Sequence, residues 1–305
     1  LRALFLLGMI GAIASAVAFA GQSEPVQEIM AKVAANQDRA VRLRSAFVYH
    51  QNLLLRFLRG NGKTAREEMR EYTVTPTENG SKKHLDRFEG RYEKDGKLID
   101  YNRPGYTYKD VDIDGELIDE LADELANEKQ SRDGIAAELF PLTSRAQPKY
   151  SFALKGKEEY RGRQAFRIAF EPRKGETSWD HGTPWAGEVL VDAQDYEPIH
   201  VTTRLAKGLP VLVTTVLGTN LRGLGFTLSY EKFDEGIWFP VKYGAEFEVK
   251  ALFFYKRKIA IALKNDGFQR ALVATKVTFE EPFTVDKKLQ VPEVKLSPVP
   301  PPEIR

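Results

Sequence analysis

Apolar and polar side chains alternate over the segment 47–59, and this is the clearest pattern in the chain. Phe47, Tyr49, Leu53 and Leu55 fall on one side of it, with His, Asn and Arg residues between them. Successive side chains of a β-strand point to opposite faces, so this period predicts a half-buried strand. Turn sequences separate it from strands predicted at 68–77 and 82–93. The first third of the chain is therefore typical of a meander of β-hairpins.

A helical period precedes these strands. Ile29, Val33 and further apolar residues of the segment 23–44 lie on one stripe, and charged residues lie off it. This spacing predicts an amphipathic helix of about five turns, with Ser23 as its cap and Pro25 in its first turn. The apolar stripe requires a partner, and the strands that follow offer the only large one.

An acidic insertion near 109–145 interrupts the strand pattern. Leucines recur at every fourth residue among acidic neighbours over 114–127, which predicts a second helix. A third, shorter helix is predicted at 131–140, where Pro141 ends it.

From residue 150 onward strands dominate again, and turn signals recur about every 10–12 residues, as expected for an antiparallel sandwich or barrel. Strands are predicted at 150–154, 164–171, 188–192, 199–205, 210–217, 224–233, 239–249, 252–263 and 268–279. The segment 252–263 has apolar residues at both parities, which suggests cover on both faces. With no charged or Pro-rich linker between the strand groups, we expect one mainly β (α+β) domain over 21–285, with about eleven strands and two or three helices.

The two ends of the chain have different compositions. An apolar run up to Phe19 follows Arg2, and small residues around Ala20 offer a cleavage site. This pattern predicts a signal peptide at 1–20, cleaved near Ala20, and thus a periplasmic protein; the alternative is a membrane anchor. The segment 286–305 is rich in proline and is predicted to be an extended tail.

Composition excludes several classes of protein. The chain has 305 residues, a net charge of +2 and no cysteine. The charge provides no field that would gather phosphates, so a nucleic-acid partner is not expected. The lack of cysteine excludes disulfides, thiol nucleophiles and a lipidated N-terminal cysteine. We expect a monomer without a cofactor.

Candidate chemistry is sparse. The four histidines form no metal-binding motif, and no Gly-x-Ser-x-Gly elbow occurs. Asp110, Asp112 and Asp114 precede a glycine with the spacing of a calcium loop, but Leu121 stands where the bidentate Glu belongs. The alternative is an acidic lead-in in which Asp114 caps the following helix.

An apolar surface is the stronger candidate site. A curved sheet with one large apolar face can enclose a cavity for lipid or acyl chains; equally, side chains and helices can fill it. Strand parity predicts the following ligand-facing residues: Phe47, Tyr49, Leu53, Leu55, Phe57, Phe166, Ile168, Phe170, Val201, Phe226, Leu228, Tyr230, Val241, Tyr243 and Phe247.

Several segments resemble the outer-membrane lipoprotein-sorting (LolA-like) superfamily. They are the helix leading into the strand at 47–59, and the runs 160–172, 185–192, 196–201 and 236–240, with Gly187, Asp192 and Pro198 in a characteristic hairpin step. The resemblance covers roughly 24–280. It implies an incomplete antiparallel β-barrel covered by helices, with an apolar cavity that holds lipoprotein acyl chains and no catalytic residue. The acidic insertion and the Pro-rich tail depart from the simple carriers.

The resulting hypothesis is a periplasmic, non-enzymatic carrier for a lipid or an acylated lipoprotein, with envelope membrane proteins as possible further partners. One alternative is an envelope sensor module that binds a partner protein through the same fold, with the acidic segment 110–128 as its contact. A second alternative is an enzyme built around His200, Asp192 and Asp195.

Overall fold

The computed structural model describes residues 25–77, 80–125, 141–175, 185–206, 220–233, 236–251 and 254–271. The chain divides into two units, Leu1–Ala271 and Leu272–Arg305, and all described residues lie in the first. The predicted helix at 131–140, the predicted strand at 210–217 and both ends of the chain lie outside the described residues.

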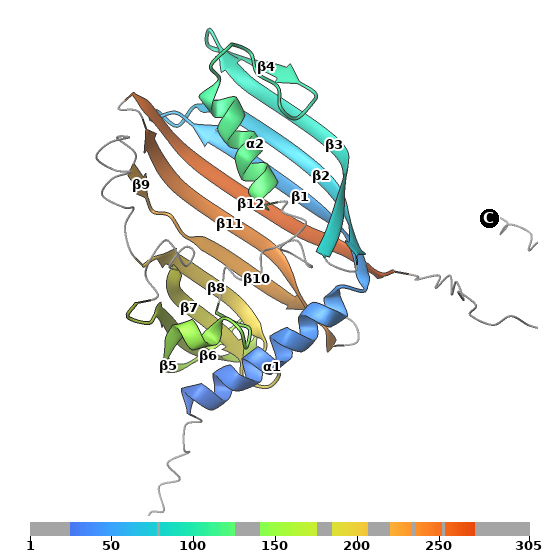
Figure 1. Cartoon of the computed structure of the whole chain (residues 1–305), viewed down its shortest axis with the longest axis vertical. Coiled ribbons are helices and arrows are strands. Elements are labelled where there is room, and N and C mark those ends of the chain that lie inside the picture. The colour runs from blue at the N-terminus through green and yellow to red at the C-terminus, as the bar shows by residue number, and fades with distance from the viewer. Residues whose placement is uncertain are drawn as a thin grey trace, which may run out of the picture. The chain divides into compact units, whose positions relative to one another are not determined.

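The first unit is built on one antiparallel sheet of twelve strands (Figure 1). Its strand order is β4-β3-β2-β1-β12-β11-β10-β8-β7-β6-β5, and the short β9 pairs with β11. The strands are β1 (Phe47–Leu58), β2 (Thr64–Thr77), β3 (Gly80–Lys94), β4 (Lys97–Tyr101), β5 (Tyr150–Tyr160), β6 (Arg163–Pro172), β7 (Trp185–Asp192), β8 (Pro198–Leu205), β9 (Asn220–Arg222), β10 (Phe226–Lys232), β11 (Trp238–Ala251) and β12 (Tyr255–Arg270). β4 and β5 are the two ends of this order and do not pair, so the sheet stays open.

Two α-helices cover one face of the sheet, which we call the inner face (Figure 1). They are α1 (Val26–Arg44) and α2 (Ile113–Leu125), and a 3₁₀ turn spans Gln147–Lys149. The predicted mainly β fold, an incomplete barrel with covering helices, is therefore confirmed. None of the described helices is long and apolar enough to cross a membrane.

Tight turns join neighbouring strands. Asp95 and Gly96 between β3 and β4 both have positive φ, as do Arg161 and Gly162 between β5 and β6. Two consecutive positive φ angles are the geometry whose twist suits a two-residue hairpin. β4, which follows the first of these turns, was not predicted as a strand, because its five residues do not alternate in polarity.

Other boundaries also differ from the sequence predictions. Pro25 is the N-cap of α1 rather than part of its first turn. β12 continues to Arg270, so Phe268 belongs to it and does not begin a separate strand. β12 is also covered on one face only, since residues such as Lys256, Ala262 and Lys264 are exposed. The predicted cover on both faces is therefore wrong.

The main hydrophobic core lies between the inner face and the helices, and a second, small cluster is separate from it. Ile237, Phe239 and Val241 form this second cluster, with Phe47 and Phe268 packed against it. A register shift between β10 and β11 causes the separation. Tyr243 pairs with Leu228, but Tyr230 pairs with Pro240, so β11 carries one extra residue between these pairs. Such a bulge reverses the face to which the following side chains point.

Candidate binding face and the helices that cover it

The inner face is apolar along most of the sheet. In β1 the odd-numbered residues from Tyr49 to Phe57 are buried, and the intervening residues are partly or fully exposed. Neighbouring strands continue the surface, because Leu55 pairs with Ile261 of β12, which in turn pairs with Ala245 of β11. Strand alternation therefore produces one apolar surface that extends over several strands.

Most of the residues predicted to contact a ligand lie together in the main core. These are Tyr49, Leu53, Leu55, Phe57, Phe166, Ile168, Phe170, Val201, Leu228, Tyr230, Tyr243 and Phe247. Phe226 is partly buried and packs against them. Phe47 and Val241 lie in the second cluster instead. That any of these residues contacts a ligand stays a prediction.

Two strands carry inner-face residues that were not among the predicted ligand-facing ones. Ile259, Ile261 and Leu263 of β12 are buried in the main core, and so are Val189 and Val191 of β7. In the sequence of β12, apolar residues recur at every second position, with lysines among the residues between them. Apolar residues at both parities near its start obscured that signal.

Three aromatic rings meet on this face where β7, β10 and β11 approach one another. The Trp185 and Phe226 rings are 4.4 Å apart, and the Phe226 and Tyr243 rings are 5.2 Å apart. Burial raises the pKa of the Tyr243 hydroxyl, so this phenol stays protonated. The Trp185 side chain is 4% exposed, and its indole Nε1 has no hydrogen-bond partner in the described part of the chain. A buried donor without an acceptor costs about 1–3 kcal/mol.

A pocket of about 480 Å³ lies beside this corner, at the junction of β8 and β10. Phe226 lines it together with small residues, among them Gly225 and Gly244. Gly225 is required there, since a Cβ at this position would lie 2.1 Å from the Thr203 carbonyl oxygen.

α2 covers the β1–β2 part of the inner face with its apolar side. Ile118 and Ala122 are fully buried, and Leu117, Leu121 and Leu125 pack against the core. The four-residue spacing seen in the sequence thus places one stripe against the sheet.

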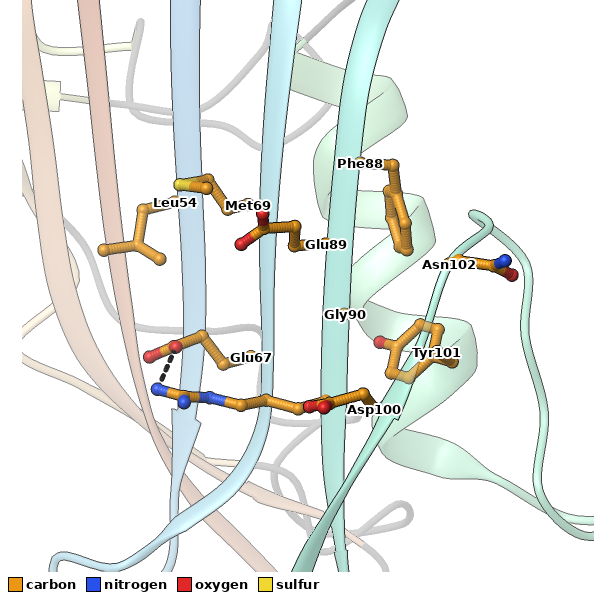
Figure 2. Close-up of a pocket in the computed structure, with 10 residues that line it drawn as sticks. Leu54, Glu67, Met69, Phe88, Glu89, Gly90, Asp100, Tyr101 and Asn102 are labelled. Carbon is orange, nitrogen blue, oxygen red and sulfur yellow. Dashed lines mark ion pairs between the residues drawn. The ribbon is translucent and has the colours of Figure 1, made fainter.

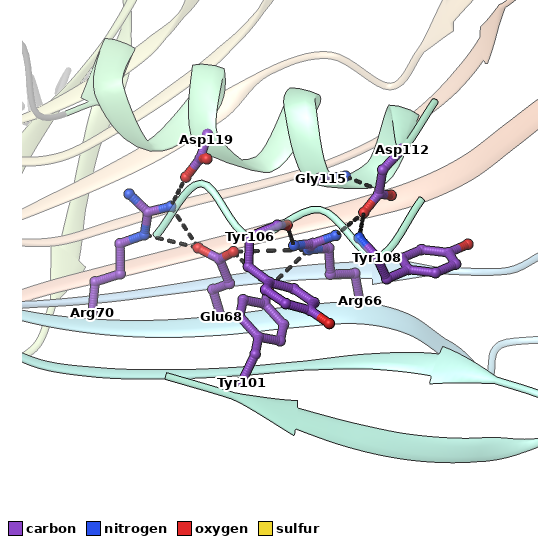
Figure 3. Close-up of polar contacts among 9 residues, drawn as sticks. All are labelled: Arg66, Glu68, Arg70, Tyr101, Tyr106, Tyr108, Asp112, Gly115 and Asp119. Atoms are coloured by element: carbon purple, nitrogen blue, oxygen red, sulfur yellow. Dashed lines mark hydrogen bonds and ion pairs between the residues drawn. The ribbon is translucent and has the colours of Figure 1, made fainter. Parts of the chain in front are cut away.

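A buried ion pair fixes the beginning of α2 (Figure 3). Arg66 of β2 lies under the helix, and its Nη1 is 2.7 Å from Asp112 Oδ2. Asp112 also accepts a hydrogen bond from the Gly115 amide at 3.1 Å, which makes it the N-cap of α2. A Cβ on Gly115 would lie 2.8 Å from both Arg66 Nη1 and Asp112 Oδ2, so a larger residue would push the ends of these paired side chains aside.

A second arginine continues the network about two turns along α2. Arg70 donates two hydrogen bonds to Glu68 Oε2, at 2.9 and 2.5 Å, and also bonds to Asp119 of α2. The Tyr101 hydroxyl donates to Glu68 Oε1 at 2.6 Å and accepts from Arg66 Nε at 2.8 Å. Although burial acts to lower it, the adjacent Glu68 carboxylate raises the pKa of Arg70. The arginines of this network therefore remain charged at any physiological pH.

The proposed calcium loop is part of this attachment. Asp112 is bound to Arg66, and Asp114 accepts hydrogen bonds from Arg257 Nη2 and the Tyr255 hydroxyl, both at 2.8 Å. Asp110 is exposed. The helix cap is therefore Asp112, two residues before the predicted Asp114. No group of three metal-ligating side chains occurs among the described residues.

α1 is attached to the turn between β7 and β8 by mostly neutral hydrogen bonds. Gln37 Nε2 donates to Glu197 Oε2 at 2.5 Å, and Asn36 Nδ2 donates to the Asp195 carbonyl oxygen at 2.8 Å. Glu197 is 5% exposed, and burial raises its pKa to about 7, against the lowering effect of Arg44. One of the residues that hold α1 therefore titrates near neutral pH.

Of the three residues of the enzyme alternative, Asp192 and Asp195 share Arg163, and His200 contacts neither of them. Asp192 forms an ion pair with Arg163 at 2.5 Å, and Arg163 also contacts Asp195. Burial acts to raise the pKa of Asp192, but the hydrogen bond from Arg163 helps to make the net shift downward. His200 Nδ1 lies 3.0 Å from Ser229 Oγ and, among the described residues, forms no ion pair with a carboxylate. Burial lowers the pKa of His200, so its imidazole is neutral. These contacts assemble no acid–base pair.

The opposite, outer face carries a pocket of about 840 Å³ over β1–β4 (Figure 2). Leu54 and Met69 form its apolar wall, and the ion pair between Glu67 and Arg91, 2.6 Å long, crosses its floor. Residue alternation along β2 places this pocket on the face turned away from α2.

Comparison with known proteins finds likeness in solved structures alone. No family model matches the chain, and no curated protein matches it. A DUF1329 family protein from Desulfovibrio piger is 11% identical, with 82% of this chain and 95% of that chain covered and a TM-score of 0.33. A domain assigned to outer-membrane lipoprotein sorting from Vibrio parahaemolyticus is 12% identical (80% and 92% covered, TM-score 0.33). A LolA superfamily protein from Nitrosomonas europaea is 11% identical (81% and 94% covered, TM-score 0.32).

Proposed function

We propose that this protein is a non-enzymatic binding protein that carries the acyl chains of a lipid or lipoprotein on its inner face. One observation carries the proposal: apart from the buried Arg66, Glu68 and Arg70 of β2, the inner face is an apolar surface of an open sheet, and part of its cover is a single 13-residue helix, α2. An acyl chain is an apolar ligand of matching chemistry, and it could occupy this surface if α2 moved.

The energies of such an exchange are comparable. A roughly sixteen-carbon acyl chain has about 14 methylenes, worth about 11 kcal/mol in gross burial at ~0.8 kcal/mol each. α2 packs five large apolar side chains and one alanine against the core, worth at most roughly 8–16 kcal/mol in total at ~1.5–3 kcal/mol for each large one. Because the two apolar terms are similar, a ligand can compete with the apolar side of the helix without being held irreversibly, while the buried ion pairs of Arg66 and Arg70 oppose its displacement.

The cluster of Trp185, Phe226 and Tyr243 favours a lipid ligand over a pure hydrocarbon. The Trp185 Nε1–H is buried next to Phe226 and has no acceptor among the described residues. The ester or amide carbonyl at the head of an acyl chain is an acceptor of the kind that this donor lacks.

The N-terminal segment supports a periplasmic setting. Its apolar run and small-residue site near Ala20 are those of an exported chain. In that compartment the protein would carry its lipid as a monomer.

Quenching of tryptophan fluorescence by a brominated acyl chain tests the proposal. Bromine quenches an indole on contact, so we expect saturable quenching in the wild type and a large loss of it in Trp185→Phe. Trp238→Phe is the matched control, since Trp238 is equally buried but its Nε1 donates to Asp195 Oδ2 at 3.3 Å. Native mass spectrometry of protein from a bacterial periplasm should also show a bound lipid.

Two results would contradict the proposal. One is a clean mass without lipid together with no saturable quenching. The other is quenching that non-brominated chains do not compete away. Either result would favour the sensor alternative, in which the filled barrel binds a partner protein.

A further inference from the structure

The two most exposed large hydrophobic side chains among the described residues lie close together. Phe254, in the turn between β11 and β12, is 77% exposed, and Val111, immediately before α2, is 67% exposed. Both line one small pocket of about 200 Å³, together with Tyr108 and Ile113. We call Phe254, Val111 and this pocket the hairpin tip. Exposed apolar side chains that gather in one place mark an interaction site more often than single ones do.

Rigid contacts hold these side chains outward. The neighbour of Phe254, Tyr255, is buried, and its hydroxyl donates to Asp114 of α2 at 2.8 Å. Arg257 donates to the same carboxylate at 2.8 and 3.1 Å. The residue after Val111, Asp112, is the buried helix cap. Because the residues beside Phe254 and Val111 are fixed inward, the two apolar side chains cannot turn into the core.

Lysines lie just behind the tip. Lys250 and Lys256 are directly paired across the hairpin, and like charges in this position repel each other. Both contact one carboxylate, Glu248, at 3.6 and 3.1 Å. Among the exposed and partly exposed charged side chains around the tip, the positive ones outnumber the negative ones by one; they are Lys109, Lys250, Lys256, Arg257 and Lys258, against Asp110, Asp114, Glu246 and Glu248. The buried Asp112, which also lines the pocket, is paired with Arg66. An anionic surface would relieve the repulsion of the lysine pair.

We propose that the hairpin tip docks on the surface of an anionic lipid bilayer. Phe254 and Val111 would enter the boundary between headgroups and acyl chains, and the lysines would contact lipid phosphates. A narrow tip with two apolar side chains is too small for a stable protein interface, which buries about 1,200–2,000 Å². It suits a shallow and reversible contact with a membrane.

Such docking would place the membrane beside the N-terminus of α2. Asp114 of α2 is bonded to the hairpin through Tyr255 and Arg257, so the tip and the helix are mechanically connected. The proposal does not depend on acyl-chain binding, because the tip lies outside the inner face.

Vesicle flotation of the full chain tests this proposal. We expect binding to vesicles of phosphatidylethanolamine and phosphatidylglycerol, and weaker binding to vesicles of phosphatidylcholine alone. Phe254→Ser should lower the binding constant about tenfold, as loss of one inserted aromatic side chain implies. Lys256→Glu should cause a smaller loss, confined to anionic vesicles and diminished at high salt. Leu98→Ser is the matched control, because Leu98 is 47% exposed on the edge strand β4, away from the tip.

The outcomes separate this proposal from the proposed function. Wild-type protein that binds neither type of vesicle, or Phe254→Ser protein that binds as well as wild type, would overturn it. Acyl-chain quenching measured without vesicles should be the same in wild type and Phe254→Ser. If that quenching is absent while flotation succeeds, the docking stands and the carrier function fails.

Discussion

α1 and α2 cover the same face of one sheet, yet the side chains that hold them there differ in charge. α2 is held by ionic bonds from Arg66, Arg70 and Arg257, and two of these arginines are almost fully buried. α1 is held mainly by amide groups, of which Gln37 reaches the buried carboxyl group of Glu197. The attachment of α2 should therefore be insensitive to pH near neutrality, whereas that of α1 should change with it.

The difference also concerns what happens when one partner is lost. Removing an arginine from under α2 leaves buried carboxylates without a counter-ion. Removing the charge at Glu197 relieves a burial penalty instead. The same kind of substitution, charged to neutral, is thus expected to destabilise one attachment and to stabilise the other.

The largest effect is expected from Arg66→Met. The substitution leaves Asp112, which is 1% exposed, without its counter-ion, and breaking a buried pair in this way costs about 3–5 kcal/mol of unfolding free energy. Urea unfolding monitored by circular dichroism measures the loss. Arg91→Met is the matched control, since Arg91 pairs with Glu67 on the outer face with its side chain 45% exposed, and such pairs contribute under about 1 kcal/mol.

A double variant sharpens this prediction. In Arg66→Met/Asp112→Asn the stranded charge is gone, so part of the lost stability should return. A loss in Arg66→Met no larger than in Arg91→Met would show that the buried network does not hold α2.

Sequence reasoning could not find this network. Arg66, Glu68 and Arg70 alternate on β2 as the polar residues of a solvent-facing side would. They are buried because Asp112 and Asp119, more than forty residues away, arrive on α2 to neutralise them. A long-range pairing of charges leaves no local pattern. For the same reason the acidic spacing before Gly115 resembled a calcium loop, because the sequence does not show that Asp112 and Asp114 bind distant arginines.

A pH-dependent effect of intermediate size is expected at Glu197. Its pKa is about 7 in the folded protein and 4.5 ordinarily, so between these values the folded state binds the proton more tightly. Stability should therefore fall as pH rises from 4.5 to 7, by about 3 kcal/mol from this group, and stay low above pH 7. Glu197→Gln should remove this dependence and be more stable than wild type at pH 8.

The comparison requires unfolding curves of wild type and variant at pH 5 and pH 8. At pH 5 the two free energies should differ little. The charged form of Glu197 is favoured by Arg44 and Arg39 and is disfavoured by Asp195. These three neighbouring residues are therefore kept unchanged in the Glu197→Gln variant. Glu231→Gln, on the half-exposed side of β10, is the control. Parallel pH profiles for wild type and Glu197→Gln would refute the assignment.

The smallest effect is expected at the C-terminal end of α2. Lys83 Nζ donates to the Leu125 carbonyl oxygen at 3.2 Å and to Gln51 Oε1 at 2.7 Å. Lys83→Met removes a cation from the negative end of the helix and should cost about 1 kcal/mol. Hydrogen exchange should become faster in the last turn of α2 and unchanged in α1. Lys82→Met, at the exposed neighbouring position, should leave both rates unaltered.

Much of the fold followed from local patterns, and the exceptions have physical causes. The alternation from Phe47 to Phe57 predicted β1 because one face of that strand is buried along its length. Val241 was placed with Tyr243 and Phe247 because a bulge cannot be recognised from parity. β4 was missed because it is short and exposed. The pairing of β1 with β12 joins residues more than two hundred positions apart, which no local pattern can reveal.

That pairing has a consequence for how the chain assembles. β1 and β12 are adjacent at the centre of the sheet, with Phe47 opposite Arg270 and Phe57 opposite Ile259. Before β12 has been synthesised, β1–β4 and β5–β11 are two separate half-sheets, and each has an unpaired edge where β12 belongs. Closing such distant contacts is slow, and unpaired edges favour aggregation. The last described strand is the one that joins the halves, so a chain truncated before residue 255 would be unable to complete its fold.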